Sequence, residues 1–247
     1  MPATLFVFLA LTIAGAPISD CIVSPGSAPV PNGSIVLPSE TPCLIGDPVR
    51  ADNGTFENGY HWAYGACQLP YYGAFGEGYD LGPGTVECAI LMLTTVPGLF
   101  HGQTLDVYIW RGGVSDAPGE VLAMSPGLVM GNIPSWPDVG RNEAEVGVDV
   151  EGAFTVGYWP NWPGQEGGFY CAADLDGVKQ HPWTCIAPGI GEIPSGWQDP
   201  SVVWDETASM GLGVKFSPRA ASVDDADADP TPPPSPTWGA VKALFGE

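Results

Sequence analysis

The stretch Thr104-Leu-Asp-Val-Tyr-Ile-Trp110 decides the fold class, because its residues alternate between two faces. Leu105, Val107 and Ile109 share one face, and the alternate positions from Asp106 to Trp110 share the other. The same alternation returns in residues 154–158 and 210–216. Residues 89–96 are instead almost continuously apolar, which indicates a strand that is covered on both faces.

Further candidate strands follow at the spacing of a sandwich or jelly roll. The full set spans residues 59–64, 72–79, 85–95, 104–110, 120–124, 145–150, 153–159, 168–173, 202–205 and 209–216. Glycine or proline interrupts nearly every window of helical length between residues 51 and 217, which disfavours helices. We therefore predict an all-β fold, an antiparallel β-sandwich of the jelly-roll type.

Composition and charge limit the possible partners. The chain has 247 residues, of which 45% are hydrophobic, so one main domain can bury a sizeable core. Its 28 acidic residues against 7 basic ones give a formal net charge of −21. A polyanion such as nucleic acid would be repelled, and so would an anionic membrane surface.

The chain divides into segments of different character. An apolar run followed by Ala14-Gly15-Ala16 predicts a signal peptide over residues 1–19, although a buried N-terminal strand is the alternative. Residues 20–50 form an extended leader rich in Pro, Ser and Gly, and residues 51–217 form the sandwich domain. An acidic and proline-rich linker, 218–236, precedes an apolar C-terminal tag, 237–247. We expect a secreted or cell-surface protein without a transmembrane helix in its mature form.

The six cysteines are an even number, which in an exported protein indicates disulfide bonds. Six cysteines allow fifteen different pairings. Pairing between nearest neighbours closes modest loops and predicts the bonds Cys21–Cys43, Cys67–Cys88 and Cys171–Cys185. No Cys-x-x-Cys spacing occurs, which disfavours a structural zinc site.

Aromatic residues beside loop prolines suggest carbohydrate recognition. Sugar rings stack their C–H faces on indole rings, and their hydroxyl groups bind polar side chains. Trp159, Trp162 and Trp183 each adjoin a proline, and we predict that they stack on a glycan. Asn161 and Asp174 lie among them and are the predicted hydroxyl-binding residues. The two segments 159–167 and 172–184 must then face the same side of the domain.

Other chemistries have weaker signals. The turn Asp174-Leu-Asp176-Gly offers alternating carboxylates to calcium, although an ordinary Asp-Gly turn explains the pattern equally well. Glycoside hydrolysis needs paired carboxylates, for which Glu87, Asp106 and Asp205 are candidates. The chain lacks the Gly-x-Ser-x-Gly elbow of many serine hydrolases. We therefore predict no catalytic residue, and expect a recognition module that binds an extracellular glycan.

Two stretches resemble a group of uncharacterised secreted β-sandwich proteins from uncultured bacterial lineages. They are Asn58-Gly-Tyr-His-Trp-Ala-Tyr-Gly65 and Gly102-Gln-Thr-Leu-Asp-Val-Tyr-Ile-Trp110. The ending Thr237-Trp-Gly-Ala-Val-Lys-Ala-Leu244 is similar to the C-terminal tags of such proteins, which implies sorting to the cell surface. This resemblance implies the fold and the location but supplies no catalytic residues. The alternative function is a structural subunit of an extracellular filament or layer, self-assembling through its termini or binding a neighbouring surface protein.

Overall fold

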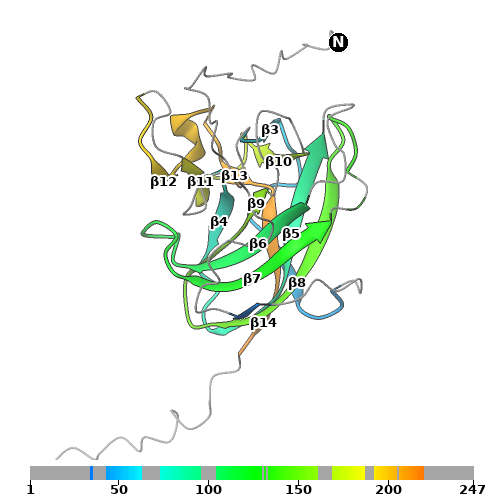
Figure 1. Ribbon diagram of the computed structural model, residues 1–247, viewed down its shortest axis with the longest axis vertical. Coiled ribbons are helices and arrows are strands. Elements are labelled where there is room, and N and C mark those ends of the chain that lie inside the picture. The colour runs from blue at the N-terminus through cyan, green and yellow to red at the C-terminus, as the bar shows by residue number, and fades with distance from the viewer. Residues whose placement is uncertain are drawn as a thin grey trace, which may run out of the picture.

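The protein is an all-β sandwich, as predicted (Figure 1). The computed structural model describes residues 34–35, 43–62, 73–95, 104–129, 131, 133–160, 169–186, 192–204 and 206–219. The predicted signal peptide, nearly all of the predicted linker and the tag lie outside these residues. In the described part of the chain, no helix is both long and apolar enough to cross a membrane.

The first sheet, which we call sheet A, contains seven strands in the order β1-β7-β6-β9-β4-β11-β12. Their bounds are β1 Ser34–Ile35, β4 Phe75–Tyr79, β6 Thr104–Arg111, β7 Val121–Val129, β9 Phe154–Pro160, β11 Pro182–Ile186 and β12 Gly196–Gln198. All neighbours in this sheet pair antiparallel except β1 and β7, which pair parallel.

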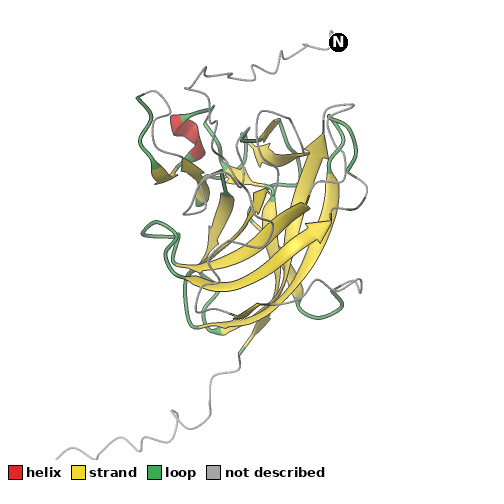
Figure 2. Cartoon of the chain, viewed as in Figure 1, coloured by secondary structure: helices red, strands yellow, loops and turns green. Residues whose placement is uncertain are grey.

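The second sheet, sheet B, is built around the twelve-residue strand β5. Its strands are β2 Asp47–Arg50, β3 Asn58–Tyr60, β5 Gly84–Thr95, β8 Gly140–Val150, β10 Phe169–Asp174, β13 Ser209–Met210 and β14 Leu212–Pro218. β8 lines one side of β5, while β14 and β10 pair with β5 as well. Figure 2 shows how little of the described chain is helical.

The main core lies between the inner faces of the two sheets. Leu105, Val107 and Ile109 of β6 are fully buried there, as their alternation predicted. Leu91 and Leu93 of β5 face them from sheet B within the same apolar cluster. Full burial of each such side chain contributes about 1.5–3 kcal/mol to folding.

A second apolar cluster covers the outer face of sheet A, and we call it the aromatic layer. It consists of Ala74, Tyr108, Trp110, Val121, Met124, Trp159 and Cys185, with Trp197 packed against it. The Trp110 ring lies over Gly157 of the next strand, where an added Cβ would stand 2.9 Å from Trp110 Cζ3 and would also strike the Phe75 carbonyl. Glycine at 157 therefore makes room for the tryptophan.

β5 is likewise covered on both faces, which confirms the prediction made from its continuous apolar sequence. Ile90 and Met92 pack with Ala172 in a third buried cluster, on the face away from the main core. Phe56 and Val139 pack against this cluster.

The sequence predictions missed several elements. β11 and β12 were not predicted, because each is short and is bordered by proline or glycine. The strand predicted at 202–205 is wrong: Pro200–Val202 is a 3-10 turn that Asp199 caps by accepting the Ser201 N–H at 2.9 Å. β2 lies in the predicted leader, yet it pairs with β14 as an edge strand of sheet B.

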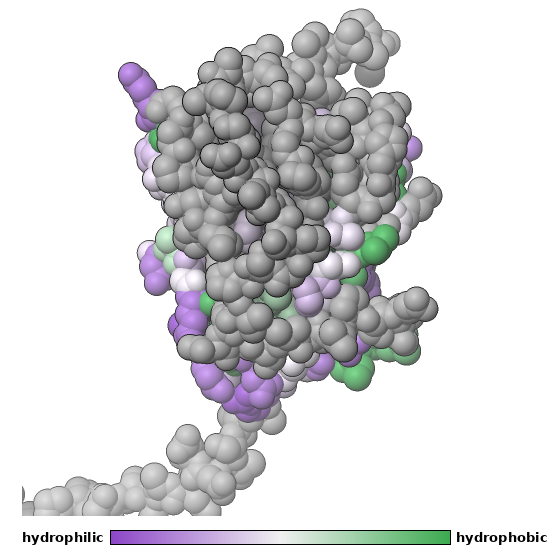
Figure 3. All heavy atoms as spheres, viewed as in Figure 1, coloured by the Kyte–Doolittle hydropathy of each residue, from purple (hydrophilic) through white to green (hydrophobic). Residues whose placement is uncertain are grey.

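The described chain enters and leaves sheet B at one end. Asp47 at the start of β2 pairs with Phe216 near the end of β14. Just beyond, Arg219 forms ion pairs with Glu151 at 2.7 Å and with Asp149 at 3.4 Å. Hydrophilic residues gather at the end where the C-terminal segment departs (Figure 3). Charged residues therefore surround this end.

Candidate functional site

Trp159 is part of the aromatic layer and presents no open ring. It stands on β9 opposite Asp106 of β6, and only 3% of its surface is exposed. Trp110 and Tyr108 of the same layer are equally buried and stack on each other, with ring centroids 5.1 Å apart. Trp159 therefore supports the sheet rather than displaying a stacking surface. Asn161 and Trp162 lie outside the described residues.

Trp183 and Trp197 remain partly exposed, at the edge of sheet A formed by β11 and β12. We call this edge the β11–β12 margin. Trp197 pairs directly with Cys185, and Trp183 lies two residues earlier on β11. Because alternate residues of a strand share a face, the two indoles are diagonal neighbours on the outer face.

Both rings are held in place. The Trp183 Nε1–H donates to the Gly113 carbonyl at 2.8 Å, which links β11 to the loop after β6. Gly113 takes φ +97°, a conformation that glycine adopts readily. Trp197 meets the Trp110 ring edge-on, with centroids 5.0 Å apart and an interplanar angle of 74°. A ligand would therefore meet indoles whose orientations are already fixed.

Polar groups accompany the two tryptophans. Ser115 and Asp116 are exposed on the loop that carries Gly113. His181 is half-buried and lies two residues before Trp183, on the same face of the strand. Trp197 was not predicted as a site residue. Its partly exposed position opposite Cys185 results from the pairing of β11 with β12, which the sequence does not reveal.

Asp174 lies in sheet B and is 1% exposed. Its carboxylate accepts main-chain N–H groups from Asn53 at 2.8 Å, Asp176 at 3.1 Å and Gly177 at 2.8 Å. These bonds tie the turn after β10 to the loop after β2. The structure therefore does not assemble Asp174 with Trp159 and Trp183 on one platform.

Among the residues that the structure describes, one group of three acids could hold a cation. Glu57, Asp174 and Asp176 place carboxylate oxygens within 4.8 Å of one another. Glu57 was not predicted, because it lies more than a hundred residues away in the chain and only β3–β10 pairing brings it close. Its carboxylate accepts the Leu175 N–H at 2.9 Å. Calcium binding by Asp174 and Asp176 stays a prediction.

The disulfide pairing differs from the predicted one. Cys43 is bonded to Cys88, across 45 positions, so the predicted bonds Cys21–Cys43 and Cys67–Cys88 are wrong. The bond fastens the segment before β2 to the middle of β5. Cys21 and Cys67 themselves lie outside the described residues. Nearest-neighbour pairing failed because sheet order, rather than distance along the chain, brings Cys43 to Cys88.

Cys171 and Cys185 are free thiols, so the predicted bond between them is also wrong. Cys171 points from sheet B into the main core, whereas Cys185 belongs to the aromatic layer outside sheet A. Sheet A thus separates the two sulfur atoms. Burial raises the pKa of Cys171 well above its usual range and that of Cys185 to about 12. Both thiols therefore resist ionisation and reaction.

The candidate acids for glycoside cleavage are not brought together. Asp106 lies in sheet A, where its carboxylate accepts the Gly127 N–H at 2.7 Å. Glu87 belongs to β5 of sheet B, and Asp205 lies outside the described residues. Glu77 of β4 is a fully buried acid, and its carboxylate accepts the N–H groups of His181 at 2.9 Å and Met210 at 2.7 Å. It has no exposed surface for a substrate.

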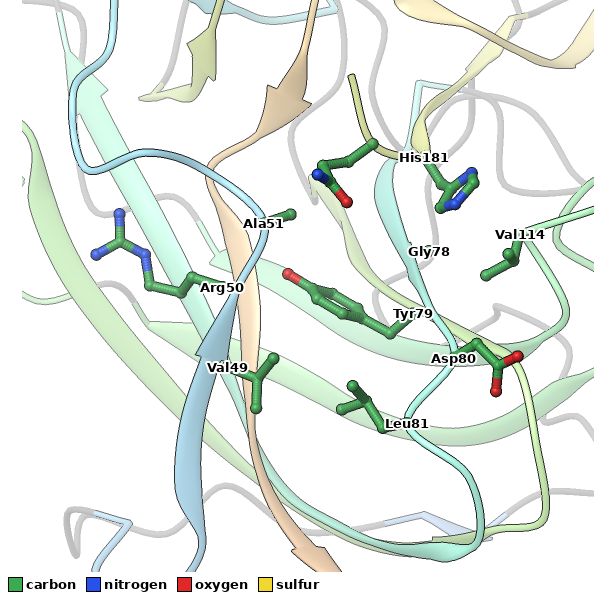
Figure 4. A pocket seen from close by; sticks show the side chains of 10 residues that line it. Val49, Arg50, Ala51, Gly78, Tyr79, Asp80, Leu81, Val114 and His181 are labelled. Atoms are coloured by element: carbon green, nitrogen blue, oxygen red, sulfur yellow. The ribbon is translucent and has the colours of Figure 1, made fainter. Parts of the chain in front are cut away.

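A pocket of about 370 Å³ lies beside β2 and β4. Its lining includes Tyr79, whose hydroxyl donates to the Leu212 carbonyl at 2.7 Å, and Arg50, whose guanidinium is paired with Asp52. In Figure 4, Arg50 and Asp80 lie on opposite sides of Tyr79. The charged groups of this pocket therefore do not converge on one ligand position.

No family model, curated protein or solved structure matches this chain. The resemblance to secreted sandwich proteins stays an expectation. Within the described residues, the β11–β12 margin combines exposed aromatic area with fixed orientation. It is the candidate functional site of the protein.

Proposed function

We propose that this protein is a non-catalytic recognition module outside the cell, which binds carbohydrate at the β11–β12 margin. The observation that carries the proposal is the arrangement of Trp183 and Trp197. Both indoles are partly exposed, and they lie as diagonal neighbours on one face of adjacent strands. Trp183 belongs to the predicted stacking residues, and Trp197 takes the place that the buried Trp159 cannot fill.

Fixed rings favour binding because less side-chain entropy is lost when a ligand stacks on them. The hydrogen bond from Trp183 to Gly113 and the edge contact of Trp197 with Trp110 supply this restraint. Sugar hydroxyl groups would find oxygen partners on the exposed Ser115 and Asp116. We assign stacking to the tryptophans and hydroxyl contacts to this loop.

A location outside the cell is supported by the disulfide bond between Cys43 and Cys88, since such bonds persist in oxidising compartments. The net charge of −21 favours neutral or cationic ligands over polyanions. Neutral polysaccharides are therefore the first ligands to test, ahead of sulfated or uronic-acid polymers.

Affinity gel electrophoresis against a panel of neutral polysaccharides tests the proposal. We expect at least one polysaccharide to retard the native chain. Trp183→Ala and Trp197→Ala should each weaken the binding about tenfold or more, the equivalent of 1.4 kcal/mol. Trp183→Phe keeps a ring but loses the bond to Gly113, so its affinity should fall between those of the wild type and the alanine variant.

Trp136→Ala is the matched control, because Trp136 is a half-buried tryptophan in the loop before β8, away from the margin. It should bind like the wild type. If the folded wild type binds none of the polysaccharides, or if Trp136→Ala loses as much affinity as the margin variants, the proposal is wrong. Size-exclusion chromatography of the wild type addresses the alternative of a filament subunit, which requires oligomers.

A further inference from the structure

The triplet Asn53-Gly54-Thr55 follows β2 in an exposed loop. All three residues are exposed. Asn-x-Ser/Thr, where x is not proline, is the acceptor pattern of asparagine-linked glycosylation. The chain contains this pattern at residues 53–55 and at residues 32–34, and residues 32 and 33 lie outside the described part of the structure.

The side chain of Asn53 is turned toward Thr55. Its Oδ1 accepts the Thr55 N–H at 2.8 Å and the Thr55 hydroxyl at 2.6 Å, which closes an Asx turn. The hydroxyl of the third residue is thus in contact with the amide that would be modified. This contact polarises the amide carbonyl and orients the Nδ2 group.

The surroundings leave room for a large group. Gly54 has φ +93°, and an added Cβ at this position would meet no atom within 4 Å. Asn53 Nδ2 donates to the Asp176 carboxylate at 2.7 Å. An amide nitrogen carries two hydrogens, so one N–H remains after a sugar is attached, and the bond to Asp176 can persist. Modification is therefore compatible with the folded loop.

We propose that Asn53 is an acceptor for asparagine-linked glycosylation, a modification that requires the export assumed in the proposed function. Asn53 Nδ2 attacks the anomeric carbon of a lipid-linked oligosaccharide that an oligosaccharyltransferase supplies. The new bond joins nitrogen to the anomeric carbon, while the bond from that carbon to the lipid pyrophosphate breaks. The pyrophosphate leaves with the electron pair, and the nitrogen loses one proton to a base on the enzyme.

The test uses the full chain behind a strong heterologous signal peptide, in a secretory expression host that performs this reaction. The background carries Asn32→Gln, so that only residues 53–55 retain the acceptor pattern. Secreted protein should run more slowly on a gel and return to its unmodified mobility after digestion with peptide-N-glycosidase. Mass spectrometry should then find Asp at position 53, because that enzyme converts the modified Asn to Asp.

Asn53→Gln and Thr55→Ala should both abolish the shift, whereas Thr55→Ser should preserve it. Asn58→Gln is the matched control, because Asn58 precedes a glycine as Asn53 does but is followed two positions later by Tyr60 instead of Ser or Thr. Secreted, folded protein with an unmodified Asn53 would overturn the proposal. The heterologous signal peptide separates this outcome from a failure of the native leader, and polysaccharide binding is measured independently on the unmodified chain.

Discussion

The carboxylate of Glu77 accepts the main-chain N–H of Met210 at 2.7 Å, which joins β4 of sheet A to β13 of sheet B. Its other oxygen accepts the N–H of His181 at 2.9 Å, just before β11. Glu77 is fully buried. One acidic side chain therefore connects both sheets and the strand that carries Trp183.

Glu77→Ala should destabilise the fold strongly. It leaves the buried N–H of Met210 and the partly buried N–H of His181 without their acceptor, and a fully buried group of this kind costs about 1–3 kcal/mol. We expect the free energy of unfolding to fall by about 2–4 kcal/mol in urea titrations. Glu145→Ala, on the exposed face of β8, is the control and should change it by less than about 0.5 kcal/mol. Equal effects of the two changes would contradict this role.

Stability should also depend on pH through Glu77. Burial raises the pKa of this carboxyl well above its ordinary value of 4.5, while its main-chain hydrogen bonds and Lys179 lower it in part. The stability contributed by the protonated form is complete below pH 4.5 and is lost as pH rises through the higher pKa of the folded state. The free energy of unfolding of the wild type should therefore fall, relative to that of Glu77→Gln, as pH rises. A wild type that gains stability relative to Glu77→Gln as pH rises would refute the prediction.

Gly157→Ala should disrupt the aromatic layer. The added methyl group would strike the Phe75 carbonyl and stand 2.9 Å from the Trp110 ring, so the strand or the ring must shift. Overpacking of this kind costs about 1–3 kcal/mol, measurable by thermal or urea denaturation. Gly152→Ala is matched to it, because a Cβ there meets nothing within 4 Å and the backbone φ is ordinary. That variant should retain wild-type stability.

The thiols of Cys171 and Cys185 should be protected in the native protein. Both are buried, and burial raises the pKa of Cys185 to about 12, so neither forms the reactive thiolate at neutral pH. Iodoacetamide should leave Cys171 and Cys185 unlabelled in the native state, as judged by mass spectrometry of the peptides that contain them. In urea without reductant, both should become labelled. Peptides that label only after reduction would instead indicate disulfide bonding of these cysteines.

The fold class could be predicted because alternation is a local property of the sequence. The pattern of Leu105, Val107 and Ile109 correctly identified the inner face of β6. Alternation does not reveal that a second apolar layer covers the opposite face, where Tyr108 and Trp110 are equally buried. Their environment is set by Gly157, Cys185 and Trp197, which reach them only through strand pairing.

The candidate site was predicted less well for the same reason. Proximity to proline suggested a loop position for Trp159, but this residue lies within β9 and is buried. Trp183 is a partly exposed ring of β11, while the position of its neighbour Trp197 depends on the register between β11 and β12. Glu57 reaches Asp174 and Asp176 through contacts between distant segments. Register and sheet order are long-range properties that no local pattern encodes.

The position of Pro218 at the end of β14 determines how the domain would be displayed if its C-terminal flank were fastened to a larger structure. The described chain ends just after β14, whereas β11 and β12 lie near the opposite pole (Figure 1). A tether through residues 220–247 would then point Trp183 and Trp197 away from the anchoring surface and toward the surrounding medium. Attachment and recognition would occupy opposite poles of one rigid body, and neither would obstruct the other.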